Sequence, residues 1–142
     1  MEFMELKGNF QVSKEDGREF INPKSYQRYD PITGIIVSLD TRGFVKLYKQ
    51  LKLPIQQAYR ELGYPQGDFN ATFKKAILSL LDTPVVDNKI YVHKGVLTYI
   101  MDDPALQDLT PAQKQLIRMG PDNERAIQAK LRDMAQALGF LN

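Results

Sequence analysis

The 142-residue chain contains no cysteine and only one histidine. A disulfide framework, a thiolate zinc site, an iron–sulfur cluster and a thiol nucleophile are therefore excluded. A Ser-His-Asp relay or a histidine-rich metal site would have to be built around the single histidine, His93. His93 lies beside a predicted hairpin turn, and we interpret it as a solvated or hydrogen-bonded turn residue.

Long apolar runs and the common catalytic motifs are also missing. The nearest runs, "GIIVSL" and "AILSLL", are far shorter than the roughly 20 residues that cross a bilayer. The opening "MEFMELKGNF" lacks the pattern of a secretory signal, and we expect residues 1–7 to be flexible or cloning-derived. There is no GxGxxG, P-loop, GxSxG or HExxH motif. We therefore expect no cofactor, and we favour a protein that is not an enzyme.

Neither sign of charge is in excess, because 19 basic and 17 acidic residues give a formal charge of +2. A dedicated nucleic-acid binder usually carries a clear basic excess, so we expect no nucleic-acid partner. The carboxylates of Asp102, Asp103 and Asp108 do not have the spacing of a calcium loop, and we expect no metal. Asp103 precedes a proline and is better interpreted as a turn or a helix cap.

The pattern of apolar residues predicts a mainly α (α+β) fold. We expect a single domain over 1–142, a compact helical domain with two small β-hairpins and a C-terminal αα-hairpin. The hairpins are predicted over 8–22 ("NFQVSKEDGREFIN") and 85–101 ("KIYV", "VLTYI"), and helices over 23–84 and 103–139.

Two prolines are expected to interrupt the helical segment. The helix that starts after Asn22 should break near Asp30-Pro31, because a residue before proline avoids the helical region. Asp40 should cap a helix over residues 41–51, and Pro54 should start another. The apolar face predicted for the helix over 41–51 consists of Phe44, Leu47, Tyr48 and Leu51.

The stretch "LTPAQKQLIRMGPDNERAIQAKLRDMAQALG" raises the question of a DNA-binding helix-turn-helix. Thr110 and Gln113 form a capping box, and Gly120 separates the two helices. The second helix begins with "PDNERA", whose carboxylates would repel phosphate. Its apolar stripe predicts packing on a core, so we interpret the pair as structural and expect Arg118 to be buried or paired. That stripe consists of Ile127, Leu131, Met134 and Leu138.

Two surface features are candidates for binding a partner. Arg42, Lys46, Lys49 and Lys52 form a basic stripe, which is either a solvated face or a contact for anionic lipid or an acidic partner. "AYRELGYPQGDFN" gathers aromatic residues around a turn, where they either wedge the turn or form an exposed platform. The candidate partner-binding residues are Tyr64, Phe69, Arg42, Lys46 and Lys49.

Several segments together resemble one bacterial family. They are "QRYDPITG", "LYKQLKLPIQQAYRELGYPQGDFN", "LLDTP" and "DDPALQDLTPAQKQLIRMGPDNERAIQAKLRDM". They are similar to the C-terminal soluble domain of the bacterial domain-of-unknown-function family 3014. The resemblance implies that an N-terminal membrane-spanning helix, which is missing here, anchors the protein in the inner membrane. It also implies that this domain lies in the periplasm. It implies no activity, so no functional residues are carried over.

Three functions remain open. The first is a non-enzymatic module that binds another envelope protein through the aromatic turn or the basic stripe. The second is an enzyme that acts on a cell-wall or lipid-derived substrate through carboxylates such as Asp102, Asp103 or Asp108. The third is a structural domain that forms a homodimer. A cleft with converging carboxylates would favour the enzyme, and a flat patch around Tyr64 and Phe69 would favour the module.

Overall fold

The computed structural model describes residues 10–141, so the N-terminal segment expected over residues 1–7 lies outside the described part. The order of elements is β1 (Val12–Glu15), β2 (Arg18–Ile21), the 3-10 helix η2 (Pro23–Tyr29), α1 (Asp30–Ser38), α2 (Thr41–Glu61), α3 (Phe69–Leu81), β3 (Tyr91–Lys94), β4 (Tyr99–Met101), α4 (Pro104–Gln107), α5 (Pro111–Arg118) and α6 (Pro121–Ala137). The mainly helical α+β class and the C-terminal helix pair are confirmed.

Both predicted hairpins are present, and they join into one antiparallel sheet with the order β1-β2-β3-β4. The β1–β2 turn consists of two residues, Asp16 and Gly17, which both have positive φ, as two-residue hairpin turns require. Phe20 of β2 pairs with Tyr91 of β3. An isolated hairpin is marginally stable in water, and here the sheet packs on α4 and α5 through one buried cluster. That cluster contains Ile21, Ile90, Val92, Met101, Leu106 and Ile117.

Of the two predicted breaks at proline, the one at Pro54 does not occur, and the one near Asp30-Pro31 occurs only as a change of helix type. η2 ends at Tyr29 as predicted, but Asp30 keeps helical φ and ψ, so an α-helix follows without an interruption. α1 begins directly at Asp30, and Pro31 lies in its first turn, where a missing N–H breaks no helical hydrogen bond. Pro54 lies inside α2, which continues from Thr41 to Glu61 as one helix. An internal proline leaves the carbonyl four residues earlier, on Gln50, without its helical N–H partner. Since Gln50 and Pro54 are both exposed, water can hydrate that carbonyl.

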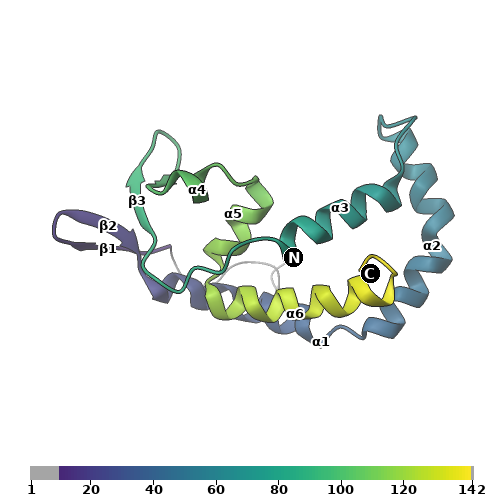
Figure 1. The fold of residues 1–142 in the computed structure, drawn as a ribbon, viewed down its shortest axis with the longest axis horizontal. Coiled ribbons are helices and arrows are strands. Elements are labelled where there is room, and N and C mark those ends of the chain that lie inside the picture. Colours follow the sequence, from purple (N-terminus) through teal and green to yellow (C-terminus); the bar gives the residue numbers. More distant parts are fainter. Residues whose placement is uncertain (1–9, 142) are drawn as a thin grey trace.

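α6 runs along the length of the molecule, and α1 lies beside it (Figure 1). The sheet, α4 and α5 lie at one end, whereas α2 and the turn that follows it lie at the other. α6 packs on α1, α2 and α3, so its apolar stripe is buried as predicted, with Ile127 and Met134 fully buried. Packing is divided among three clusters along this axis.

The C-terminal end of α3 is held by two glutamine side chains from other helices. Gln113 of α5 donates to the Ser79 carbonyl at 3.0 Å. Gln128 of α6 donates to the carbonyls of Leu80 and Thr83 at 3.1 and 3.0 Å. The Ser79 and Leu80 carbonyls also accept from the side chain and the N–H of Thr83, so the two buried amides add second bonds there and pair the Thr83 carbonyl.

Candidate functional site

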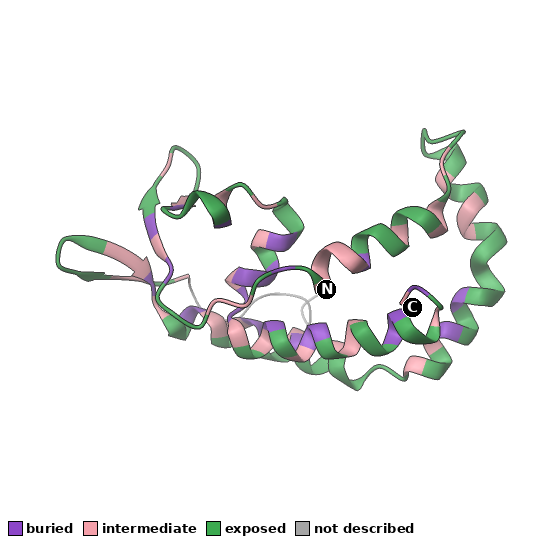
Figure 2. Cartoon of the chain, in the orientation of Figure 1, coloured by how far each residue is buried: buried purple, intermediate pink, exposed green. Residues whose placement is uncertain are grey.

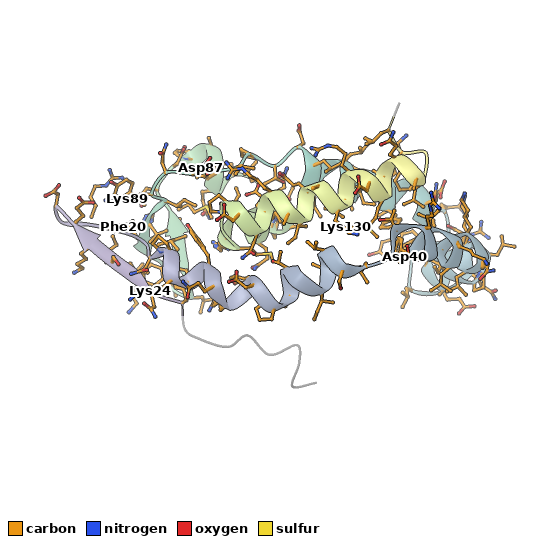
Figure 3. All side chains as sticks on the ribbon, turned by 90° about the horizontal axis from the view of Figure 1, so that it is seen from below. Phe20, Lys24, Asp40, Asp87, Lys89 and Lys130 are labelled. Atoms are coloured by element: carbon orange, nitrogen blue, oxygen red, sulfur yellow. The ribbon has the colours of Figure 1, made fainter. Side chains whose placement is uncertain are left out.

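α2 is the most exposed long helix, as Figure 2 shows along most of its length. Asp40 caps it by accepting the Gly43 N–H at 3.2 Å. Lys130 of α6 holds the segment between α1 and α2 by donating to the Leu39 carbonyl at 2.6 Å. In Figure 3, Lys130 lies close to Asp40. Only Val45 and Tyr48 of α2 are fully buried, so most of the helix is free to face a partner.

The aromatic residues that the sequence gathers around the turn form a continuous chain of ring contacts. Tyr64 stacks on Tyr59 with centroids 4.6 Å apart, and Tyr59 meets the edge of Phe69 at 5.5 Å. Phe69 continues to Phe73 at 5.8 Å, and Phe73 to the buried Tyr48 at 5.2 Å. Phe69 is half-buried, whereas Tyr64 is 54% exposed. The turn is therefore tied to the α2–α3 core, and Tyr64 forms its exposed end.

The same turn is held by Gln56, which makes two hydrogen bonds to its backbone. Gln56 Nε2 donates to the Gly67 carbonyl at 2.7 Å, and Gln56 Oε1 accepts the Phe69 N–H at 2.7 Å. Gly67 lies against Tyr59, where an added Cβ would come within 2.6 Å of a ring carbon. Residues 62–68 are thus held in one conformation by contacts with α2.

We expect Gln56→Ala to release this turn. Two hydrogen bonds to half-buried backbone groups would be lost, at a cost of about 1–2 kcal/mol in the free energy of unfolding. Amide hydrogen exchange should speed up at Phe69 and Gly67, while amides of the sheet keep their protection. Gln57→Ala is the matched control, because Gln57 only contacts Glu61 at the surface. Unchanged exchange at Phe69 in Gln56→Ala would contradict this role.

The basic residues of α2 lie mainly along one exposed side. Arg42, Lys46, Lys49 and Arg60 fall within about 60° of one another around the helix axis, at about 100° per residue. We call these four residues the basic flank. Within residues 10–141, no residue of the basic flank forms an ion pair with a carboxylate, and neither does Lys52. Three basic residues elsewhere pair with carboxylates, Arg18 with Asp102 at 3.3 Å, Lys89 with Glu15 and Arg125 with Asp87. Others, such as Lys74 and Lys75 of α3, form no ion pair in this range either.

A hollow of about 510 Å³ separates the end of α2 from the turn. Lys52, Leu53, Gln56 and Arg60 line it from α2, and Phe69 lines it from the other side. We call this the turn hollow. Leu53, at its rim and between residues of the basic flank, is 82% exposed. The hollow joins Phe69 to Lys52 and Arg60, and the acidic residue Asp68 also lines it. The other candidate residues do not line it: Arg42, Lys46, Lys49 and Tyr64.

The structure corrects the apolar face predicted for the first half of α2. Leu47 and Leu51 do not face the core with Tyr48 but are 54% and 42% exposed. They continue into an exposed apolar row on the side of α2 away from the basic flank, which also includes Pro54, Ala58 and Leu62. The error arose because α2 carries more apolar positions than a single inward face can bury. These residues share one side of α2 only because the helix continues through Pro54. Two separate helices, as the sequence predicted, would not place them in one row.

Of the carboxylates named for an enzyme, Asp102 and Asp103 line one cavity of about 360 Å³, whereas Asp108 does not line it. Asp102 accepts from Arg18 at 3.3 Å and lies 2.7 Å from His93 Nδ1, and the His93 hydrogen bond, aided by Arg18, lowers the pKa of Asp102. Asp103 caps α4 by accepting the Ala105 N–H, and Asp108 lies at its other end. Across residues 10–141, no group of three or more histidine, aspartate or glutamate side chains could hold a metal ion.

A cavity of about 400 Å³ lies between η2, residues 86–89 and the start of α6. Its charged side chains already have partners: Asp30 accepts from Asn123 at 3.0 Å, and Asp87 pairs with Arg125. Lys89 pairs with Glu15 and lies 4.7 Å from the centre of the Phe20 ring; Lys89 and Phe20 are neighbours in Figure 3. Asp122 also lines the cavity and lies 3.8 Å from Arg125.

The residues assigned to structure lie at the start and end of α5. Thr110 Oγ1 accepts the Gln113 N–H at 3.2 Å, and Gln113 Oε1 accepts the Thr110 N–H at the same distance, which makes a capping box. Gly120 has φ of +95° and precedes α6. Arg118 is half-buried and has no ion-pair partner in the described part of the chain.

None of the helices within residues 10–141 has the length and hydrophobicity needed to cross a membrane. A comparison with curated proteins and one with solved structures gave no match. The model of one family, described as a protein of unknown function (DUF3014), matches residues 1–135. The match extends over nearly the whole chain and includes α2, the turn and the helix pair. The chain therefore belongs to the DUF3014 family.

Proposed function

We propose that this chain is a non-enzymatic protein-interaction module and that the basic flank and the turn hollow are its binding surface. The observation that carries the proposal is the row of unpaired basic side chains on α2, next to a hollow with an exposed leucine at its rim. One exposed leucine alone is common on protein surfaces, so the proposal depends on its position beside the hollow and the basic flank. A turn held by Gln56 would be presented to a partner with little loss of conformational freedom.

The alternative of a carboxylate-dependent enzyme has less support. Asp102 and Asp103 line one cavity, but Asp102 is bound by Arg18 and His93 and Asp103 caps α4, while Asp108 lies apart from them. The charged groups of the 400 Å³ cavity each have a neighbouring side-chain partner. General acid–base catalysis is favoured by a group that can reach a bound substrate freely, and the side chains of Asp102 and Asp103 are held by these contacts.

The setting that we propose is the bacterial envelope. The family resemblance described for the sequence implies a membrane-spanning helix before this domain, which would hold the module outside the inner membrane. Another envelope protein would then be its partner. Protease added to spheroplasts that produce the full-length natural protein should cut the domain without lysis. Protection until lysis would place the domain on the other side.

The binding surface can be tested by photo-crosslinking in the native cells. A photoreactive amino acid at Gln50, which is exposed beside the basic flank, should give a discrete crosslinked protein band. The band should be lost when Lys46→Glu and Lys49→Glu are added. The same photoreactive group at Gln136, exposed on α6, is the control. No band from Gln50, or the same band from both positions, would contradict the proposal.

A further inference from the structure

We infer that the partner presents an acidic peptide segment with one apolar anchor side chain to the basic flank and the turn hollow. This inference rests on the proposed function and names the chemistry of the partner at the same site. The anchor would enter the hollow beside Leu53 and Phe69, and carboxylates on either side of it would pair with the basic flank.

The charge of α2 supports an acidic partner. Over residues 41–61 the helix carries five basic residues and one acidic residue, Glu61, which gives a net charge of +4. None of the basic flank pairs with a carboxylate of residues 10–141, so its charge is not neutralised within the described part of the chain. Complementary charges across an interface speed association and exclude wrong partners, so a carboxylate-bearing segment fits this row.

The shape of the site supports a single anchor. Leu53 is the one leucine on the side of α2 that carries the basic flank, and it stands at the rim of the hollow between Lys49 and Arg60. The hollow has an apolar contribution from Phe69 and Tyr48 on its inner side. Interfaces gain most of their affinity from a few apolar anchors in a pocket with polar groups around them. One leucine or phenylalanine side chain with flanking carboxylates matches this arrangement.

Two other occupants fit less well. A bilayer would take up the exposed row of Leu47, Leu51 and Leu62, but that row lies about 150° around the helix from the basic flank. A flat anionic surface therefore cannot contact both at once. A second copy that docked on the basic flank itself would bring two rows of like charge together, with only Glu61 on each helix to offset them. A second copy that docked on the exposed apolar row would leave the basic flank uncovered.

The test uses labelled peptides and fluorescence anisotropy with the whole chain. The probe is a glutamate-rich peptide with one central phenylalanine, compared with the same peptide carrying serine at the centre and with a lysine-rich version. We expect the phenylalanine peptide to bind about tenfold more tightly than the serine peptide, as burial of one apolar side chain would give. The lysine-rich peptide should not bind.

Two sets of variants locate the site. Lys49→Glu with Arg60→Glu should weaken binding of the acidic peptide about tenfold or more and create affinity for the lysine-rich one. In Leu53→Gln the phenylalanine peptide should bind no more tightly than the serine peptide. Both glutamate-rich peptides should still bind more tightly than the lysine-rich one. Lys74→Glu with Lys75→Glu, two exposed lysines on α3, is the matched control and should change neither.

Several results would overturn the inference. Equal binding of the phenylalanine and serine peptides would show only diffuse charge attraction. Capture of the chain by vesicles that contain phosphatidylglycerol, with no peptide binding, would assign the surface to lipid. A concentration-dependent dimer that Lys49→Glu with Arg60→Glu disrupts would assign it to a second copy. Crosslinking from Gln50 to a protein in cells without binding of the acidic peptide would overturn this inference alone and leave the proposed function in place.

Discussion

Gly120→Ala should lower the free energy of unfolding by about 3 kcal/mol or more. Gly120 has φ of +95° and ψ of 155°, a region that is open almost only to glycine and costs other residues about 1–3 kcal/mol. An added Cβ would also lie 2.5 Å from Cγ of Tyr26, with two further atoms of that side chain below 3.0 Å. The tyrosine would have to move, and η2 would separate from the start of α6.

Urea unfolding measures this effect, and two variants separate its causes. Tyr26→Ala combined with Gly120→Ala should recover part of the steric loss, because alanine removes the ring but keeps the Cβ that lies 2.7 Å from the added methyl group. The backbone part of the loss should remain. Gly34→Ala is the control: Gly34 lies in α1 with nothing within 4 Å of its added Cβ and no positive φ. It should be neutral or stabilising by about 0.4–1 kcal/mol. A Gly120→Ala protein as stable as the native chain would show that the positive φ is not required.

Glu124→Gln should make the protein more stable above pH 7, by about 2–3 kcal/mol. Glu124 is 1% exposed, and its Oε1 has no hydrogen-bond partner in residues 10–141. Its Oε2 lies 3.4 Å from Gln128 Nε2, which already serves two carbonyls. Burial raises the pKa of Glu124 to about 7, an effect that Arg125 opposes and Asp87 reinforces. The charged form is thus disfavoured in the folded protein.

The dependence on pH has a definite direction. Below the unfolded pKa of 4.5 the carboxyl is protonated in both states and costs nothing. Between pH 4.5 and about 7 the unfolded chain loses the proton while the folded protein keeps it, so the free energy of unfolding falls as pH rises. Above about pH 7 the carboxyl is ionised in both states, and the free energy of unfolding does not fall further on its account. Glutamine cannot ionise, so the variant should lack this fall.

The measurement is the difference in unfolding free energy between native chain and variant at several pH values, so that other titrating groups cancel. Glu61→Gln is the control, since Glu61 is an exposed glutamate on α2. The control shows what the loss of one exposed carboxyl does to the same measurement. A flat difference for Glu124→Gln would mean that the buried carboxyl is stabilised in its charged form by interactions that the geometry does not show.

Local signals in the sequence predicted local structure well. The two-residue turn at Asp16-Gly17 fixes its hairpin, and Thr110 with Gln113 marks the start of α5, because each depends on neighbours within a few residues. The pairing of β2 with β3 joins residues about seventy positions apart, and no local pattern encodes it. The continuity of α2 through Pro54 was missed because tolerance of an internal proline depends on exposure of the freed carbonyl.

The candidate site was predicted only in parts. Spacing along the chain located the basic residues and the aromatic turn, including Tyr64 and Phe69. It could not show that Gln56 ties the turn to α2, since that contact depends on how the chain folds back after Gly63. That the basic flank forms no ion pairs could not be predicted from the sequence either. It depends on where the carboxylates of the other elements lie in the folded protein.

The antiparallel pairing of β2 with β3 also bears on the order in which the chain folds. Phe20 and Tyr91 are partners, and η2, α1, α2 and α3 all lie between them in the sequence. The β2–β3 pairing therefore closes a long loop of the chain. Closing such a loop in an unfolded chain has an entropic cost, and helix formation within the loop reduces that cost. Each hairpin can form early by itself, whereas the contact between them must wait until the helices have brought its two halves together.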